Sequence, residues 1–216
     1  MNSNEVTIWD YLKSQGLNDF AVAGIMGNLY AESGLQPDNL QNNYESILNM
    51  NDFQYTQAVD NGTYNNFVYD KAGYGLAQWT FWSRKDGLLR MVKRYTKSIA
   101  DLNVQLEYLC DELKEFGLWD KLNACNSVKD ASNLILFEYE KPYDTGNAVQ
   151  IARGNWSQQF YDKYHNTNTA VTVPVPDKVE MYGIMALMNL DKESAIKLAH
   201  SLQEVGMTVS VFPVEC

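Results

Sequence analysis

Cysteine and histidine are both scarce in this chain of 216 residues. It has three cysteines, none of them in a C-x-x-C pair, and two histidines. A disulfide framework, a Cys–His nucleophilic pair and a His-rich zinc site all need more of these residues at closer spacing. The sequence therefore argues against cysteine peptidases and zinc amidases, and we expect neither a metal nor another cofactor.

Positive charge is also in deficit. The chain has 17 Lys and Arg against 27 Asp and Glu, which gives a formal net charge of −10 at pH 7. A cationic surface for phosphate groups is therefore disfavoured, and nucleic acid is not an expected partner. No apolar run approaches the roughly 20 residues of a membrane span, and the start, Met-Asn-Ser-Asn-Glu, has no signal-peptide pattern. We expect no membrane insertion, and delivery by a route other than secretion.

Helical periodicity is the main pattern of residues 1–164, and it indicates one mainly helical domain. The segment Thr63–Trp79, rich in Tyr, Phe and Gly, predicts a small β-hairpin region. Residues 165–178 are rich in Thr, Asn, Pro and Val and are typical of a linker. Residues 179–216 show a β-α-β pattern that is too short to bury a sufficient core alone. The expected fold class is therefore α+β.

One acidic residue stands on an apolar helical stripe. Val22, Ile25 and Leu29 follow one another at helical spacing, and Glu32 is the next position of that stripe. Burial disfavours an ionised carboxylate, and the end of a helix adds negative partial charge. A carboxylic acid that keeps its proton near neutral pH is what general-acid catalysis at a glycosidic oxygen requires. The alternative is a carboxylate that points to solvent beyond Gly34.

The segment Ala72–Thr80 (AGYGLAQWT) joins two glycines to aromatic and amide side chains. Glycines allow a tight turn or a close approach of the backbone to a ligand. Tyr74 and Trp79 offer stacking faces and Gln78 offers an amide, and such groups bind sugars. The alternative interpretation is that these aromatic residues belong to the core.

Together, three segments of the chain resemble the phage tail lysozyme family. They are residues 25–34 (IMGNLYAESG), residues 72–80 and the stretch 137–142 (FEYEKP). The resemblance extends over about residues 6–164, and the chain is more distantly similar to goose-type lysozymes and soluble lytic transglycosylases. It implies that residues 1–164 form a lysozyme-like catalytic domain.

The resemblance also implies roles for individual residues. Glu32 becomes the general acid at the end of the catalytic helix, and Gln78 becomes a residue of the cleft that positions substrate or water. Ser33, Tyr74 and Trp79 are the further residues expected to bind substrate.

A second catalytic carboxyl group is harder to assign. Retaining glycosidases hold two carboxyl groups about 5–5.5 Å apart and inverting ones about 6.5–9.5 Å apart. Asp70, just before the glycine-rich turn, is our candidate, whereas Asp60 lies in an Asp-Asn-Gly sequence that favours a turn. Glu138 and Glu140 are interpreted as structural ion-pair or cap residues. A mechanism with a single Glu remains the alternative.

The resulting functional hypothesis is a phage peptidoglycan hydrolase. It would cleave the β-1,4 bond between N-acetylmuramic acid and N-acetylglucosamine, with peptidoglycan glycan strands as its partner. It would act as an endolysin released through a holin lesion or as a lysin carried on the tail. A lytic transglycosylase that uses the same Glu is one alternative, and a non-catalytic structural or wall-binding phage protein is another. Residues 179–216 would bind the wall, form an oligomer or belong to a larger domain.

Overall fold

The computed structural model describes residues 3–165, all within one compact unit of the chain, Met1–Val171. Helices make up 65% of the described part. Its α-helices are α1 (Ser3–Ser14), α2 (Asp19–Ser33), α3 (Asn42–Leu48), α4 (Asp52–Asp60), α5 (Trp82–Tyr95), α6 (Leu102–Glu115), α7 (Trp119–Asn123), α8 (Val128–Leu134) and α9 (Asn147–Tyr164). A π-helical segment, η1 (Ile135–Glu140), continues directly from α8.

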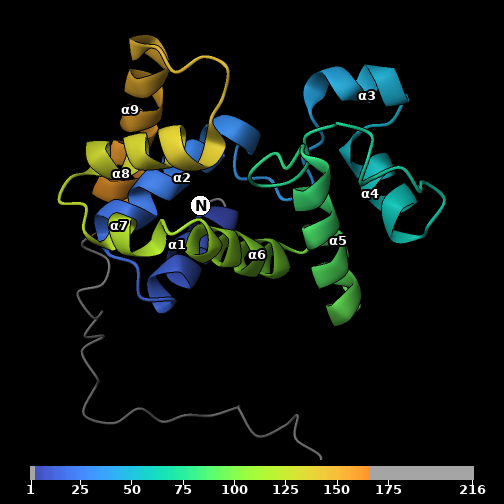
Figure 1. Ribbon diagram of the computed structural model, residues 1–216, viewed down its shortest axis with the longest axis horizontal. Helices are drawn as coiled ribbons and strands as arrows, with labels where there is room; N and C mark the ends of the chain where they lie inside the picture. The colour runs from blue at the N-terminus through green and yellow to red at the C-terminus, as the bar shows by residue number, and fades with distance from the viewer. Residues whose placement is uncertain (1–2, 166–216) are drawn as a thin grey trace, which may run out of the picture. The chain divides into compact units, whose positions relative to one another are not determined.

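Helix α2 is the central element of this unit. The side chain of Asn18 caps its N-terminus by accepting a hydrogen bond from the backbone N–H of Ala21, and Gly34 ends it in the left-handed conformation. Every residue from Ala21 to Leu29 is buried, as expected of a helix that is surrounded on all sides. It packs against α1, α7, α8, η1 and α9, which Figure 1 shows gathered around it.

Two glycines bring the neighbouring helices close to α2. A Cβ atom on Gly24 would lie 2.7 Å from backbone and side-chain atoms of Ala131 in α8. A Cβ atom on Gly27 would lie 2.0 Å from the hydroxyl oxygen of Ser157 in α9. Any side chain at either position would push these helices apart, so the glycines fix the approach of α8 and α9.

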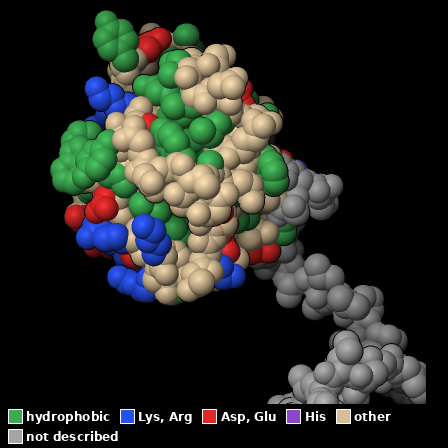
Figure 2. All heavy atoms as spheres, turned by 90° about the vertical axis from the view of Figure 1, so that its right-hand side faces the viewer, with side chains coloured by type: hydrophobic (Ala, Val, Ile, Leu, Met, Phe, Trp, Pro, Cys, Tyr) green, Lys and Arg blue, Asp and Glu red, His purple; other side chains and the backbone are tan. Residues whose placement is uncertain are grey.

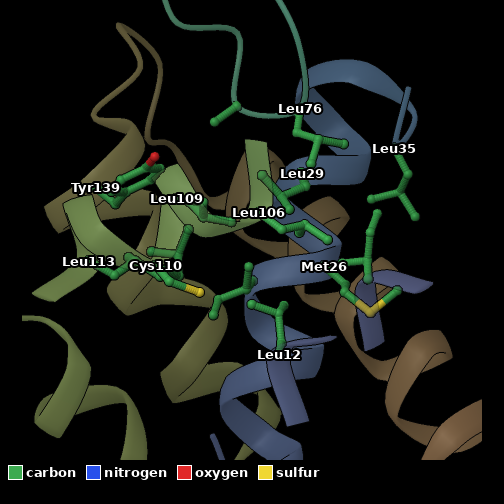
Figure 3. Packing of buried hydrophobic residues seen from close by; sticks show 14 of the residues in the cluster. Leu12, Met26, Leu29, Leu35, Leu76, Leu106, Leu109, Cys110, Leu113 and Tyr139 are labelled. Atoms are coloured by element: carbon green, nitrogen blue, oxygen red, sulfur yellow. The ribbon is translucent and has the colours of Figure 1, made fainter. Parts of the chain in front are cut away.

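The core extends from α2 to α6. Figure 3 shows side chains of α1, α2, α6 and η1 pointing toward one another, with Leu76 of the loop before α5 among them. Leu106, Leu109 and Leu113 form the apolar face of α6 and are almost fully buried. Because α6 contacts both α1 and α5, it joins the helices around α2 to the remaining helices (Figure 1).

The predicted α+β fold class is wrong, because the described residues contain no strand or sheet. In place of the β-hairpin there are two isolated bridges, Leu40 with Tyr74 and Tyr74 with Trp79. Residues 72–77 are all buried, so the segment is covered on both sides and does not alternate between core and solvent as a surface hairpin does. The predicted linker and the β-α-β segment at residues 179–216 lie outside the described residues.

Candidate active site

A polar cleft of about 680 Å³ opens beside the C-terminal end of α2. Its wall combines two carboxyl groups and one guanidinium group with a majority of uncharged residues. The lining residues are Glu32, Asn39, Gln41, Asn42, Asn43, Ala77, Gln78, Thr80, Phe81, Arg84, Glu140 and Pro142. Such a set of five amides and one hydroxyl suits a neutral ligand that offers many hydrogen-bonding groups.

Glu32 lies at the last turn of α2 and lines this cleft, with its side chain 20% exposed. Its Oε1 accepts a hydrogen bond of 2.5 Å from Nη2 of Arg153, a largely buried residue of α9. Nη1 of Arg153 donates to the side-chain oxygen of Asn28 at 3.1 Å. Sequence reasoning missed Arg153 because it considered only the helix of Glu32, whereas the two residues are 121 positions apart.

Ser33 is buried and does not line the cleft. Its hydroxyl oxygen lies 2.9 Å from the carbonyl oxygen of Leu76 and 3.1 Å from that of Leu29, so it can donate to either. Because Leu76 belongs to the loop that carries Gln78, Ser33 joins the end of α2 to that loop.

Gln78 is a half-buried residue of the cleft wall. Its Nε2 donates to the side-chain oxygen of Asn39 at 2.8 Å and to the Asn39 carbonyl oxygen at 3.0 Å. Its backbone has a φ of 45°, a conformation that a residue other than glycine rarely adopts. A Cβ atom on Gly73 would lie 2.8 Å from Oε1 of Gln78. The glycine at that position therefore leaves room for the amide.

Tyr74 and Trp79 are fully buried and do not line the cleft. The Tyr74 hydroxyl lies 2.6 Å from the Thr56 hydroxyl, and Nε1 of Trp79 donates to Glu112 at 2.7 Å. The aromatic residue of the cleft wall is Phe81, which is 61% exposed. Phe81 directly follows the segment 72–80, but composition alone could not separate the exposed aromatic residues here from the buried ones.

Asp70 lies in a buried network and not among the residues of the cleft. Its Oδ1 forms an ion pair of 2.5 Å with Nζ of Lys85, which is itself fully buried. Its Oδ2 accepts hydrogen bonds from the hydroxyls of Tyr55 and Tyr64 at 2.6 and 3.1 Å. Asp60 does not line the cleft either: it accepts hydrogen bonds from residues 98 and 99.

Glu138 and Glu140 differ in their surroundings although they are two residues apart. Glu138 forms an ion pair of 2.6 Å with Lys121 on the surface, as sequence reasoning expected. Glu140 lines the cleft, and its Oε1 is buried without a hydrogen-bond partner among the described residues. Burial above all, and then the negative charge of Glu32, raise the pKa of Glu140 to about 8. Sequence reasoning treated both as structural and missed the difference.

The face of the molecule beside α3, α4 and α5 is mostly uncharged. Figure 2 shows this face covered largely by uncharged polar groups, backbone and scattered hydrophobic side chains, with Lys and Arg toward its edge. On the exposed surface, Phe81 and Trp82 lie side by side, with ring centroids 6.0 Å apart. Such an exposed aromatic pair can stack on the apolar face of a ligand.

The cleft holds the carboxyl groups of Glu32 and Glu140, and paired carboxyl groups are what enzymes that cleave glycosidic bonds use. The family model for phage tail lysozyme matches residues 3–164, and the chain therefore belongs to the phage tail lysozyme family. This confirms the resemblance found in the sequence. Membership indicates a lysozyme-like, glycosidase-type enzyme that acts on peptidoglycan, and fits a phage-encoded product acting on the cell wall. Among the described helices, none has the length and hydropathy needed to cross a membrane.

Proposed function

We propose that this protein is an N-acetylmuramidase with Glu32 as its general acid. It hydrolyses the β-1,4 bond between N-acetylmuramic acid and N-acetylglucosamine in peptidoglycan, as an endolysin or as a tail-associated lysin of a phage. Glu32 delivers a proton to the glycosidic oxygen, and a water molecule attacks the sugar carbon. Gln78 helps to position the substrate or this water.

The observation that carries the proposal is the place of Glu32. Its carboxyl group lies at the end of a buried helix and lines the same cleft as Gln78. Arg153 and Asn28 fix the orientation of this carboxyl group through a chain of hydrogen bonds. A general acid must be held within reach of the leaving oxygen, and a group fixed on a rigid helix meets that requirement.

The wall of the cleft supports a glycan as the substrate. Acetamido and hydroxyl groups of peptidoglycan sugars are neutral donors and acceptors, which match the side-chain amides of Asn39, Gln41 and Asn42. Phe81 presents an exposed ring at the same wall, on which the apolar face of a sugar can stack.

The variant Glu32→Gln tests this assignment. It removes the proton donor but keeps the size of the side chain and an acceptor for Arg153, so we expect clearance of purified peptidoglycan to fall by about 10²–10⁴-fold. The matched control is Glu138→Gln, the same substitution at an exposed ion pair outside the cleft, which should keep full activity. Wild-type activity in Glu32→Gln would refute the role of Glu32.

Analysis of the products separates hydrolysis from transglycosylation. Hydrolysis leaves a reducing N-acetylmuramic acid end, whereas attack by the muramic 6-hydroxyl leaves a 1,6-anhydro end. We expect reducing ends in a digest by the wild-type protein, measured by mass spectrometry. A digest with mainly 1,6-anhydro ends would make the protein a lytic transglycosylase that uses the same Glu32.

A further inference from the structure

One oxygen of the Glu140 carboxyl group has no hydrogen-bond partner among the described residues. Its Oε1 is buried, accepts no hydrogen bond from the described residues and forms no ion pair with them. Leaving such a group unsatisfied costs free energy in any fold. It nevertheless lines the same cleft as Glu32, so the group that the fold leaves unsatisfied lies where the substrate is expected.

The proposed reaction also leaves one question about Glu32 open. Its Oε1 accepts a hydrogen bond of 2.5 Å from the guanidinium group of Arg153. An oxygen that accepts a charged hydrogen bond is not the oxygen that carries a transferable proton. The proton that reaches the glycosidic oxygen is therefore carried on the other oxygen of Glu32, Oε2, and a second carboxyl group in the same cleft can supply it.

The backbone that carries Glu140 is unusual in two respects. Glu140 is the last residue of the π-helical segment η1, and isolated π-helical turns are frequent at functional sites. The next residue, Lys141, has a φ of 50°, in the left-handed region that side chains other than glycine rarely adopt. Pro142 then lines the cleft. An irregular helix end thus carries Glu140 and the chain after it to the wall of the cleft.

We propose that Glu140 is the proton-holding partner of Glu32, so that the two carboxyl groups share one proton and one negative charge in the resting enzyme. The inference rests on the proposed function of Glu32 and names the source of its proton. Glu140 acts through Glu32 as a positioning residue for that proton, and Glu32 remains the group that faces the substrate.

The proposed catalytic cycle neither gains nor loses protons. When the glycosidic bond breaks, the shared proton passes through Glu32 to the glycosidic oxygen, which keeps the bonding electron pair. The two carboxyl groups then carry two negative charges. Water adds its oxygen to the sugar carbon and returns one proton to the pair, so each bond cleaved consumes one water molecule.

Charged groups on four neighbouring elements face Glu140 and set its proton affinity. Burial has the largest effect on the pKa of Glu140 and raises it, and the charges of Glu32 in α2 and Glu112 in α6 act in the same direction. Arg84 in α5 and Arg153 in α9 act in the opposite direction. The two cations are thus close enough to stabilise the second negative charge that appears during the reaction.

The pH profile of Glu140→Gln is the first test. Gln keeps the shape of the neutral carboxyl group but holds no transferable proton. We expect kcat at pH 7 to fall at least about tenfold, KM to change little, and the alkaline limb of the profile to move at least about one pH unit lower. The control Glu138→Gln should keep the wild-type profile. A purely structural Glu140 would leave the limb where it is, and that result would overturn the inference.

A titration that does not depend on activity is the second test. In protein labelled with ¹³C at the glutamate side-chain carboxyl carbon, one signal of the wild type should titrate above pH 7. It should be absent in Glu140→Gln, unchanged in Glu138→Gln and shifted to lower pH in Glu32→Gln, where a like charge is removed. A wild-type protein without this signal would overturn the inference even if Glu140→Gln does not fold.

The two proposals fail in different ways. If Glu32→Gln is inactive while Glu140→Gln keeps both the wild-type profile and the wild-type titration, the role of Glu140 is refuted and that of Glu32 stands. If Glu32→Gln is as active as the wild type, the proposed function fails, and the proton relay fails with it.

Discussion

Replacing Asp70 by Asn separates a structural carboxylate from a catalytic one. Asp70 and Lys85 form a buried ion pair, with side chains 2% and 0% exposed. The same Lys85 Nζ donates to the carbonyl oxygen of Ala72 at 2.7 Å. The pair therefore joins the start of α5 to the loop that carries Gln78. Asn keeps the shape of Asp70 but leaves the buried ammonium group without a counter-charge.

The expected loss of stability follows from this burial. Removing one partner of a buried ion pair typically costs about 3–5 kcal/mol, and 1 kcal/mol corresponds to about 2–4 °C in Tm for a protein of this size. We therefore expect Asp70→Asn to lower the Tm by about 6–20 °C. Burial lowers the pKa of Lys85 and Asp70 opposes that effect, so the variant should also favour loss of the Lys85 proton.

Thermal unfolding followed by circular dichroism measures this loss, and peptidoglycan clearance well below both Tm values measures activity. Activity should fall less than about tenfold, because Asp70 is not a residue of the cleft. Glu138→Gln is again the control, since it breaks an exposed ion pair whose contribution is about 0–1 kcal/mol. A variant that melts like the wild type but loses as much activity as Glu32→Gln would show that Asp70 takes part in catalysis.

Two further predictions concern the cleft wall and pH. Phe81→Ala should raise KM for soluble glycan fragments about two- to tenfold with little change in kcat, because a stacking contact is worth about 0.5–1.5 kcal/mol in substrate and transition state alike. The control is Tyr69→Ala, which removes an exposed aromatic side chain outside the cleft. An unchanged KM for Phe81→Ala would exclude stacking. The pKa of Glu140 is raised from an ordinary 4.5 to about 8, so between these pH values only the folded state holds this proton and stability falls as pH rises. Glu140→Gln should therefore gain Tm relative to the wild type from pH 4.5 to pH 8, and an equal Tm difference at both pH values would contradict the shift.

Much of the helical fold could be predicted from local patterns. The turn signal at residues 60–62 marks the end of α4 in the structure. Gly34 likewise ends α2 with a φ of 62°. The hairpin predicted at Thr63–Trp79 is absent, and in its second part, residues 72–79, the strand-like composition reflects burial among other elements. Gln105 of α6 accepts a hydrogen bond from the backbone N–H of Leu76, so the loop pairs with a side chain where a strand would pair with backbone.

The candidate site could be predicted only in part. Glu32 and Gln78 lie in compact motifs, and the structure brings both to the cleft. Arg153 and Glu140 come from distant segments, and only the packing of α9 and η1 against α2 brings them to the end of that helix. The interpretation of Glu140 as a structural residue missed its place in the cleft, because nothing in the local sequence separates it from Glu138, which forms a surface ion pair.

Glu112, which is buried, and Glu140, which is half-buried, differ in how well their carboxyl groups are hydrogen-bonded. Glu112 accepts hydrogen bonds from the indole N–H of Trp79 and the hydroxyl of Tyr139, and from Arg84 at both oxygens. Its charge is therefore matched and it stabilises the junction of α6, η1 and the loop before α5. The residue after Tyr139 is Glu140, whose Oε1 has no such partner among the described residues. The fold thus satisfies the carboxylate of Glu112 but leaves Oε1 of Glu140 without a partner in the cleft of Glu32, at a cost in stability. Such a cost is expected where a proton must remain transferable.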